Sequence, residues 1–237
     1  EGMVTTQAVA GDYVHQVNTL IGTKGTGLTS GYLYPGATYP YGMVQFTPSY
    51  FSKRSGFVIN QLSGGGCEHM GNFPTFPVKG KLKMSPDNIL NYRINVSEEK
   101  GHAGYYEAMV QEDIKAKLTV TERTGMASYE YPADQQYGTI IIGGGISATP
   151  IEQAAIVITA PNKCEGYAEG GNFCGLRTPY KVYFVAEFDT DAFETGTWKR
   201  EELMPNTTFA EGEYSGVYFT FDVNKKKNIQ YKIGVSY

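Results

Sequence analysis

Alternation of apolar and polar residues is the feature that most constrains how this chain can fold. In the run Lys181–Phe188 every second residue is apolar, and Lys181 and Glu187 lie on the opposite face. The runs Ile114–Thr121, Val217–Asn224 and Ile229–Val235 repeat the pattern. Because successive side chains of a β-strand point to opposite faces, this period of two predicts strands that bury one face.

The spacing between these runs predicts how the strands are connected. No amphipathic helical pattern separates them, so we do not expect parallel βαβ units. The 19 Tyr, 12 Phe and 29 Gly residues suit aromatic strand positions and tight turns. We therefore predict an all-β fold, a large antiparallel β-sandwich in which residues 1–237 form a single domain.

Several shorter segments can also be assigned from their patterns. We expect further strands at Val78–Met84, Met126–Tyr131, Thr139–Ile142 and Ala154–Thr159. Gly166–Arg177 is rich in glycine and predicts a loop, and the basic triplet Lys225–Lys227 predicts a solvated hairpin turn.

Charge and hydropathy exclude two classes of partner. The net charge of −4 and the pI near 5.5 argue against a nucleic-acid-binding surface. No apolar stretch approaches the roughly 20 residues that span a bilayer, so no membrane segment is expected. The N-terminus also lacks the apolar region of a signal peptide, so an exported form would be one that has already been processed.

The three cysteines cannot all pair with one another. Cys164 and Cys174 lie near the same glycine-rich segment and could bridge it, which would leave Cys67 as a thiol. No Cys and His spacing indicates a zinc site.

The stretch Tyr34–Gly80 differs from the rest of the chain. Its five prolines and eight glycines predict loops, and it also carries polar side chains and many aromatic rings. Such loops on a rigid scaffold are typical of a binding face. The alternative is a structural crossover that is packed by its own Tyr and Phe side chains.

Carboxylates are the most frequent candidates for acid–base chemistry in this chain, and such chemistry uses one group as the acid and a second as the base. Most of them lie in alternating strands or acidic turns, where a solvated role is expected. Glu68 beside His69 is the pair whose apolar, glycine-rich setting could shift a pKa. The candidates are Glu68, Glu107, Glu187, Asp189, Asp191 and Asp222.

Three ordered segments resemble the opening of the glycoside hydrolase family 92 α-mannosidases. They are VNTLIGT (Val17–Thr23), YPGATYPYGMVQFTP (Tyr34–Pro48) and NQLSGGGCEHMGNFPTFP (Asn60–Pro77). The similarity continues through Gly104–Gly125, Thr178–Phe188 and Ile229–Tyr237, and it therefore covers nearly the whole chain.

This resemblance implies a fold and an activity. The chain would be the N-terminal β-sandwich, a supersandwich like that of galactose mutarotase, which precedes an (α/α)6 helical domain lying outside this chain. The parent would be a periplasmic or extracellular bacterial enzyme that removes terminal mannose with inversion and needs Ca²⁺. Its acid, base and Ca²⁺ ligands would come mainly from the helical domain, so this chain would contribute neither catalytic residues nor metal ligands and would be inactive alone. Its partners would be a mannose-containing glycan and the helical domain.

The resemblance also implies which residues of this chain contact the sugar. They lie in Pro35–Thr38 and around Leu62–Gly71, where glycine lets backbone N–H groups approach sugar hydroxyls. The chain departs from the family in reading VINQLSG at Val58–Gly64, where many members have a pattern like SHTHLSG, so an α-1,2 linkage is not implied. The substrate-binding residues implied are Gly36, Ala37, Thr38, Gln61, Gly64, Gly65, Cys67, Glu68 and His69.

Two other roles stay open at the level of sequence. A free-standing carbohydrate-binding module would use a stacking platform of exposed tyrosines, for which Tyr32, Tyr34, Tyr39, Tyr41 and Tyr50 are the candidates. A purely structural sandwich would only position a partner domain. If the sandwich packs against a helical domain, the chain alone is expected to show an apolar patch near Tyr34–Pro77 or to cover it by self-association. The expected members of the patch are Tyr39, Tyr41, Phe57, Met70, Phe73 and Phe76.

Overall fold

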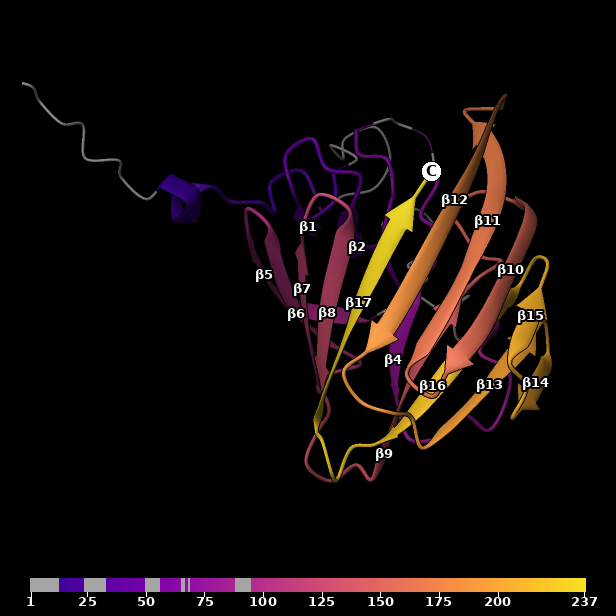
Figure 1. The fold of residues 1–237 in the computed structure, drawn as a ribbon. Helices are drawn as coiled ribbons and strands as arrows, with labels where there is room; N and C mark the ends of the chain where they lie inside the picture. The colour runs from indigo at the N-terminus through magenta and orange to yellow at the C-terminus, as the bar shows by residue number, and fades with distance from the viewer. Residues whose placement is uncertain (1–12, 24–32, 50–55, 65–66, 68, 88–94) are drawn as a thin grey trace, which may run out of the picture.

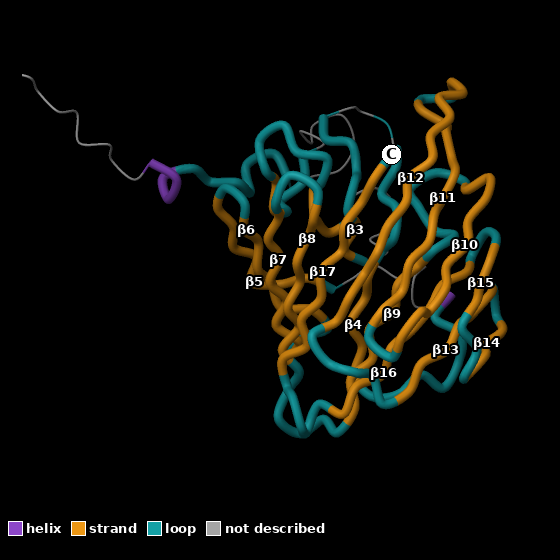
Figure 2. The backbone as a smooth tube through the Cα atoms, in the orientation of Figure 1, coloured by secondary structure: helices purple, strands orange, loops and turns teal. Residues whose placement is uncertain are grey.

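Two packed β-sheets form the chain (Figure 1). The computed structural model describes residues 13–23, 33–49, 56–64, 67, 69–87 and 95–237. One short 3-10 helix, η1 (Tyr13–Gln16), precedes the strands. Figure 2 shows that strands make up nearly all of the regular structure. Among the described residues, no helix is both long enough and apolar enough to cross a membrane.

The first sheet has eight strands. In spatial order they are β1 (Ala37–Thr38), β2 (Gln45–Pro48), β3 (Phe57–Val58), β4 (Thr75–Lys79), β9 (Tyr137–Gly143), β16 (Ser215–Asp222), β13 (Glu194–Lys199) and β14 (Glu202–Pro205).

The second sheet has nine strands. In spatial order they are β15 (Phe209–Glu211), β10 (Ile151–Ala160), β11 (Lys163–Phe173), β12 (Leu176–Phe188), β17 (Asn228–Ser236), β8 (Thr124–Glu130), β7 (Ile114–Val120), β6 (Tyr105–Val110) and β5 (Val96–His102). Neighbouring strands in both sheets run antiparallel, for example β12 with β17 and β16 with β9. The predicted all-β antiparallel sandwich is confirmed.

Aromatic side chains from both sheets meet in the core. Phe188 of β12 lies between the sheets, with ring centroids 4.7 Å from Phe219 and 5.1 Å from Phe221 on β16. Phe73, which precedes β4, packs 4.1 Å from Phe184 of β12. Close-packed rings of this kind bury much apolar area per residue, and they hold the two sheets together.

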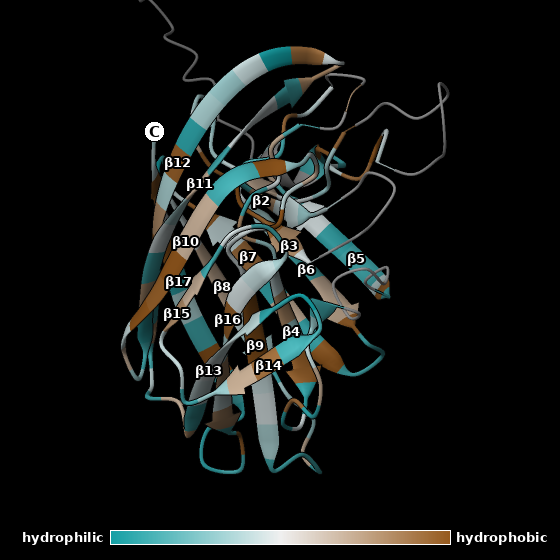
Figure 3. Ribbon diagram, turned by 90° about the vertical axis from the view of Figure 1, so that its right-hand side faces the viewer, coloured by the Kyte–Doolittle hydropathy of each residue, from teal (hydrophilic) through white to brown (hydrophobic). Residues whose placement is uncertain are grey.

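The predicted alternation holds for burial along the second half of β12. Figure 3 shows the hydropathy of the residues along the strands. From Val182 to Phe188 the side chains are alternately buried and exposed, as the sequence pattern requires. The strands expected at Met126–Tyr131, Thr139–Ile142 and Ala154–Thr159 are also present, within or overlapping β8, β9 and β10.

The strand expected at Val78–Met84 is wrong beyond Lys79, where β4 ends. Gly80 has a φ of +75°, which the extended backbone of a strand does not allow. The Thr139 hydroxyl donates to the Gly80 carbonyl at 2.7 Å and holds the chain where it leaves the sheet.

The loop expected at Gly166–Arg177 is also wrong, because these residues belong to the longest hairpin of the molecule. β11 and β12 pair from Lys163–Glu187 as far as Phe173–Leu176, with Cys174 and Gly175 as the turn. At Gly166 a Cβ atom would lie 2.2 Å from the Ala155 carbonyl oxygen of β10. This glycine therefore permits a close approach of strands and does not mark a loop.

The basic triplet Lys225–Lys227 lies in a turn, but this turn is not a hairpin. It connects β16 of the first sheet to β17 of the second, so the flanking strands do not pair with each other. The Lys226 ammonium instead forms an ion pair with Asp189 at 2.7 Å, which ties this connection to the end of β12.

Candidate functional site

The Pro35–Thr38 segment belongs to the edge of the first sheet. Ala37 and Thr38 form β1, which pairs with β2; Ala37 is buried in the core and Thr38 is exposed. The Gly36 amide donates to the Thr47 hydroxyl at 3.1 Å. A Cβ at Gly36 would lie 2.2 Å from the Phe46 carbonyl oxygen, so glycine is required here for packing against β2.

The predicted loop Leu62–Gly71 connects β3 and β4. Leu62, Ser63 and Gly64 are exposed, and Gly64 has a φ of +71° with open space around it. Cys67 is half-buried and His69 is buried. Gly65 and Glu68, also predicted to bind substrate, lie outside the described residues, and so does the carboxylate of the proposed Glu68–His69 pair.

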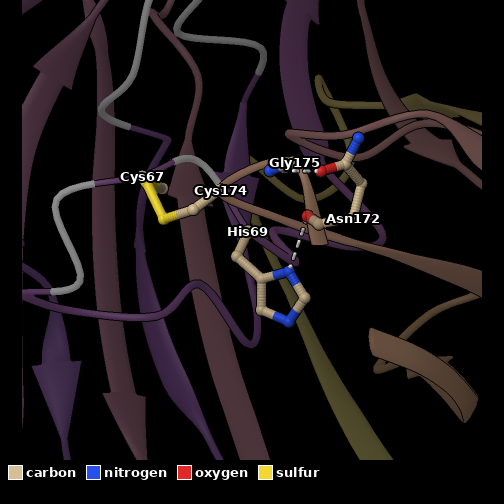
Figure 4. The surroundings of a disulfide bond; sticks show 5 residues. All are labelled: Cys67, His69, Asn172, Cys174 and Gly175. Carbon is tan, nitrogen blue, oxygen red and sulfur yellow. Dashed lines mark hydrogen bonds between the residues drawn. A yellow bond between two sulfur atoms is a disulfide. The ribbon is translucent and has the colours of Figure 1, made fainter. Parts of the chain in front are cut away.

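Cys67 is covalently linked to the turn of the β11–β12 hairpin. It forms a disulfide with Cys174, 107 residues away in the sequence (Figure 4). The Cys164–Cys174 bridge considered from the sequence is therefore wrong. Cys164 is a free thiol that is buried in the hydrophobic core, and burial raises the pKa of this thiol far above its usual range. The sequence offered no signal for the Cys67–Cys174 pairing. Cys164 lies near the start of β11, at the end of that strand that is far from the Cys174 turn.

His69 makes a second link between the loop and the hairpin. Its Nδ1 donates to the Asn172 carbonyl oxygen at 3.1 Å (Figure 4). The ring lies 5.1 Å from that of Phe173 and 5.6 Å from that of Tyr180, measured between centroids. His69 is thus part of a packed contact between the two segments.

A buried amide network lies at the start of the same loop. The Asn60 side chain donates to Asn72 Oδ1 at 3.0 Å and accepts from the Asn72 backbone amide at 2.8 Å. It also donates to the hydroxyl of Tyr237 at 3.2 Å, near the end of β17. Asn60 was noted among the polar residues of the Tyr34–Gly80 stretch, but its pairing with Asn72 was not expected, because two asparagines 12 positions apart carry no pattern.

Gln61, next to this network, has no partner in the described part of the chain. The residue is 1% exposed, and neither its amide nitrogen nor its amide oxygen has a hydrogen bond. Its side chain lies beside Gly71 and Ala148, and the buried Thr149 hydroxyl likewise lacks a partner. Nearby, burial raises the pKa of Tyr180.

Three of the other candidate carboxylates lie in ion pairs away from this loop, and Glu187 and Asp191 are exposed. Glu107 on β6 accepts from the Tyr105 hydroxyl at 2.8 Å, which lowers the pKa of Glu107. Asp222 pairs with Lys225 at 3.5 Å, and Asp189 pairs with Lys226.

The residues proposed for the stacking platform and for the apolar patch differ in how far they are exposed. Tyr39 is 50% exposed and Tyr41 is fully exposed, whereas Phe57, Phe73 and Phe76 are buried. An exposed apolar patch of six side chains was expected. For Phe57, Phe73 and Phe76 this expectation is wrong, because all three are buried. Tyr32 and Tyr50 of the expected stacking platform lie outside the described residues.

We tested whether the described residues fit a calcium site. Among them, no three His, Cys, Asp or Glu side chains lie close enough together to hold a metal ion. The described residues therefore offer no cluster of charged ligands for Ca²⁺.

Solved structures that this chain resembles include family 92 glycosidases. The chain aligns with the GH92 glycosyl hydrolase ccman5 with a TM-score of 0.79 and 20% identity, covering 95% of this chain and 32% of that one. It aligns with the α-mannosidase BT3965 of Bacteroides thetaiotaomicron, in complex with mannoimidazole, with a TM-score of 0.78 and 24% identity, covering 94% and 32%. The inverting mannosidase BT2199 of the same organism gives 0.78 and 23%, covering 94% and 31%. At these identities the likeness shows the fold.

Sequence comparison identifies the family. An uncharacterized secreted glycosidase of Arthroderma benhamiae is 30% identical over 142 residues, which is 52% of this chain and 18% of that protein. The chain thus spans about a third of its solved relatives and less of this curated one. Residues 16–236 match the model of the glycosyl hydrolase family 92 N-terminal domain, and the chain belongs to that family.

Proposed function

We propose that this chain is the N-terminal sandwich of a secreted, exo-acting, inverting and calcium-dependent α-mannosidase. A helical (α/α)6 domain of the same polypeptide supplies the acid, the base and the calcium ligands, and the sandwich packs against it. Pro35–Thr38 and Leu62–Gly71 contribute to the wall of the pocket that holds the terminal mannose. Family membership supports a glycosidase parent, and the solved relatives named as mannosidases support a mannose-containing glycan as the substrate.

The unpaired amide of Gln61 carries this proposal. A buried polar group without a partner costs about 1–3 kcal/mol, so a ligand that pairs with this amide would gain affinity from it. A sugar hydroxyl can both donate and accept, and it therefore matches an amide that offers an N–H and a C=O. Gly64, which has open space around it, leaves room for a sugar ring to approach the backbone.

The disulfide supports a secreted location. Such bonds persist in the periplasm and outside the cell, whereas the cytosol keeps thiols reduced. Cys67–Cys174 and the secreted relative point in the same direction.

A structure of the joined polypeptide with mannoimidazole tests the placement of the sugar. We expect the Gln61 amide within hydrogen-bonding distance of a sugar hydroxyl, with the Leu62–Gly71 loop against the ring. A sugar bound with no contact to this loop would refute the role of the loop.

The exposed tyrosines favour a second candidate, a free-standing carbohydrate-binding module. Tyr39 and Tyr41 lie close in sequence and present their rings to solvent, as a stacking platform requires. Glycan-array binding by the chain alone, lost in the Tyr39→Ala and Tyr41→Ala variants but kept in Gln61→Met, would favour this module over the mannosidase domain.

A further inference from the structure

The β11–β12 hairpin extends beyond its neighbours in the sheet. β11 pairs with β10 only as far as Gly170, and β12 pairs with β17 only from Tyr183 onward. Between these points the two strands pair with each other alone, and Figure 1 shows the hairpin rising past the ends of the adjacent strands. A two-stranded ribbon is marginally stable in water, so this projection needs support from elsewhere.

That support comes from the Leu62–Gly71 loop. Cys67 is bonded to Cys174 at the turn, and His69 donates to the Asn172 carbonyl at 3.1 Å (Figure 4). The His69 ring also packs on Phe173. These contacts join a loop of the first sheet to a hairpin of the second.

The same contacts hold Cys67 and His69 of the loop in place. Glycine loses more conformational freedom on ordering than any other residue, and the described residues Gly64 and Gly71 flank these two contacts. A loop that is already fixed does not lose this freedom when a ligand binds, and its affinity is higher for that reason.

We propose that Cys67, Cys174 and His69 are positioning residues that clamp the loop against the hairpin and thereby set the affinity for the terminal mannose. This inference rests on the proposed function. The new element is that the β11–β12 hairpin determines where the Leu62–Gly71 loop lies. No sequence pattern connected this hairpin to the site. Because Cys174 is exposed and Cys67 is half-buried, the bond is open to reductants.

The first test uses reduction and substitution in the polypeptide that joins this chain to the helical domain. Dithiothreitol converts the bond to two thiols and is itself oxidised to a cyclic disulfide. We expect reduction, or the paired substitutions Cys67→Ser and Cys174→Ser, to raise KM for an aryl α-mannoside. The rise is roughly tenfold for each backbone residue that must be ordered again on binding. The value of kcat stays near that of the wild type, because the clamp affects binding uniformly.

His69 provides a test that leaves the disulfide intact. His69→Ala removes the hydrogen bond to Asn172 and should raise KM. His69→Asn places an N–H donor near the position of Nδ1 and should restore KM in part, whereas His69→Gln places it further out and should not. Cys164→Ala, a cysteine change distant from the clamp, is the matched control and should leave KM unchanged.

Hydrogen exchange separates this inference from the proposed function. Releasing the clamp should speed amide exchange in Leu62–Gly71. If folded Cys67→Ser/Cys174→Ser and His69→Ala variants keep both the wild-type KM and slow exchange, the clamp is refuted while the mannosidase proposal stands. If exchange rises on release but the wild-type polypeptide neither binds nor cleaves α-mannosides, the proposed function and the affinity role are refuted together.

Discussion

At the scale of single residues, two adjacent amides of the β3–β4 connection have opposite roles. The Asn60 side chain forms hydrogen bonds with Asn72 and Tyr237. Gln61 is equally buried yet has no partner among the described residues. The resemblance identified Gln61 as a binding residue, but no property of the sequence distinguished a satisfied amide from an unsatisfied one. That difference depends on segments that are distant in the chain, and only the fold brings them together.

This contrast predicts opposite effects of substitution. Gln61→Met keeps the shape and removes an unsatisfied group, so we expect the free energy of unfolding to stay the same or rise by about 1 kcal/mol. Sugar affinity should nevertheless fall about tenfold, the equivalent of one lost hydrogen bond. Asn60→Ala should instead destabilise the chain by roughly 1–3 kcal/mol. Urea unfolding measures both, and a clear loss of stability in Gln61→Met would mean that its amide is paired.

At the scale of elements, the clear alternation of β7, β12 and β17 could be predicted because each of these strands buries one face. The one-sided burial expected for Val217–Asn224 is wrong, because β16 is buried on both faces. Glycine-rich segments could not be read in the same way. Gly166 occurs inside β11 because a neighbouring strand comes too close for a side chain, and not because the backbone turns. The tight turn of the β11–β12 hairpin was not predicted either. Cys174 adopts a φ of +51° and Gly175 a φ of +83°, but of these two residue types only glycine commonly adopts a positive φ.

Two glycines in strands of the same sheet test this reading. Gly166→Ala would place a methyl group 2.2 Å from the Ala155 carbonyl oxygen, and it should lower the free energy of unfolding by roughly 1–3 kcal/mol. At Gly234 on β17 the nearest atom to a new Cβ is Thr124 Oγ1 at 3.8 Å. Gly234→Ala should therefore be neutral or stabilise the chain by up to about 1 kcal/mol. Equal urea midpoints for the two variants would contradict this account of β11.

At the scale of the whole molecule, the two sheets are joined by an aromatic core and by one disulfide. The sandwich could be predicted from the strand patterns, and the family resemblance agreed with it. The cross-link could not, since three cysteines allow several pairings and the chosen one spans 107 residues. The site is consequently less predictable than the fold, because it combines loops and a hairpin from different sheets.

The cross-link should contribute strongly to global stability. In the chain-entropy view a bridge that closes about 100 residues contributes about 4.7 kcal/mol, and measured losses are typically 2–5 kcal/mol. We expect a loss in this range when urea unfolding is repeated with dithiothreitol. The buried Cys164 is the only other cysteine, so the effect can be assigned to this bond. Unchanged unfolding after complete reduction would contradict this assignment.

The central claim is that this chain completes the sugar pocket of a mannosidase without supplying its catalytic groups. The most direct measurement is the release of mannose from an aryl α-mannoside, with calcium present, by the purified chain and by the polypeptide that joins it to the helical domain. We predict no hydrolysis by the chain alone and hydrolysis by the joined polypeptide, which is lost when calcium is chelated. Calcium-dependent mannose release by the isolated chain, or an inactive joined polypeptide that is correctly folded, would contradict the account.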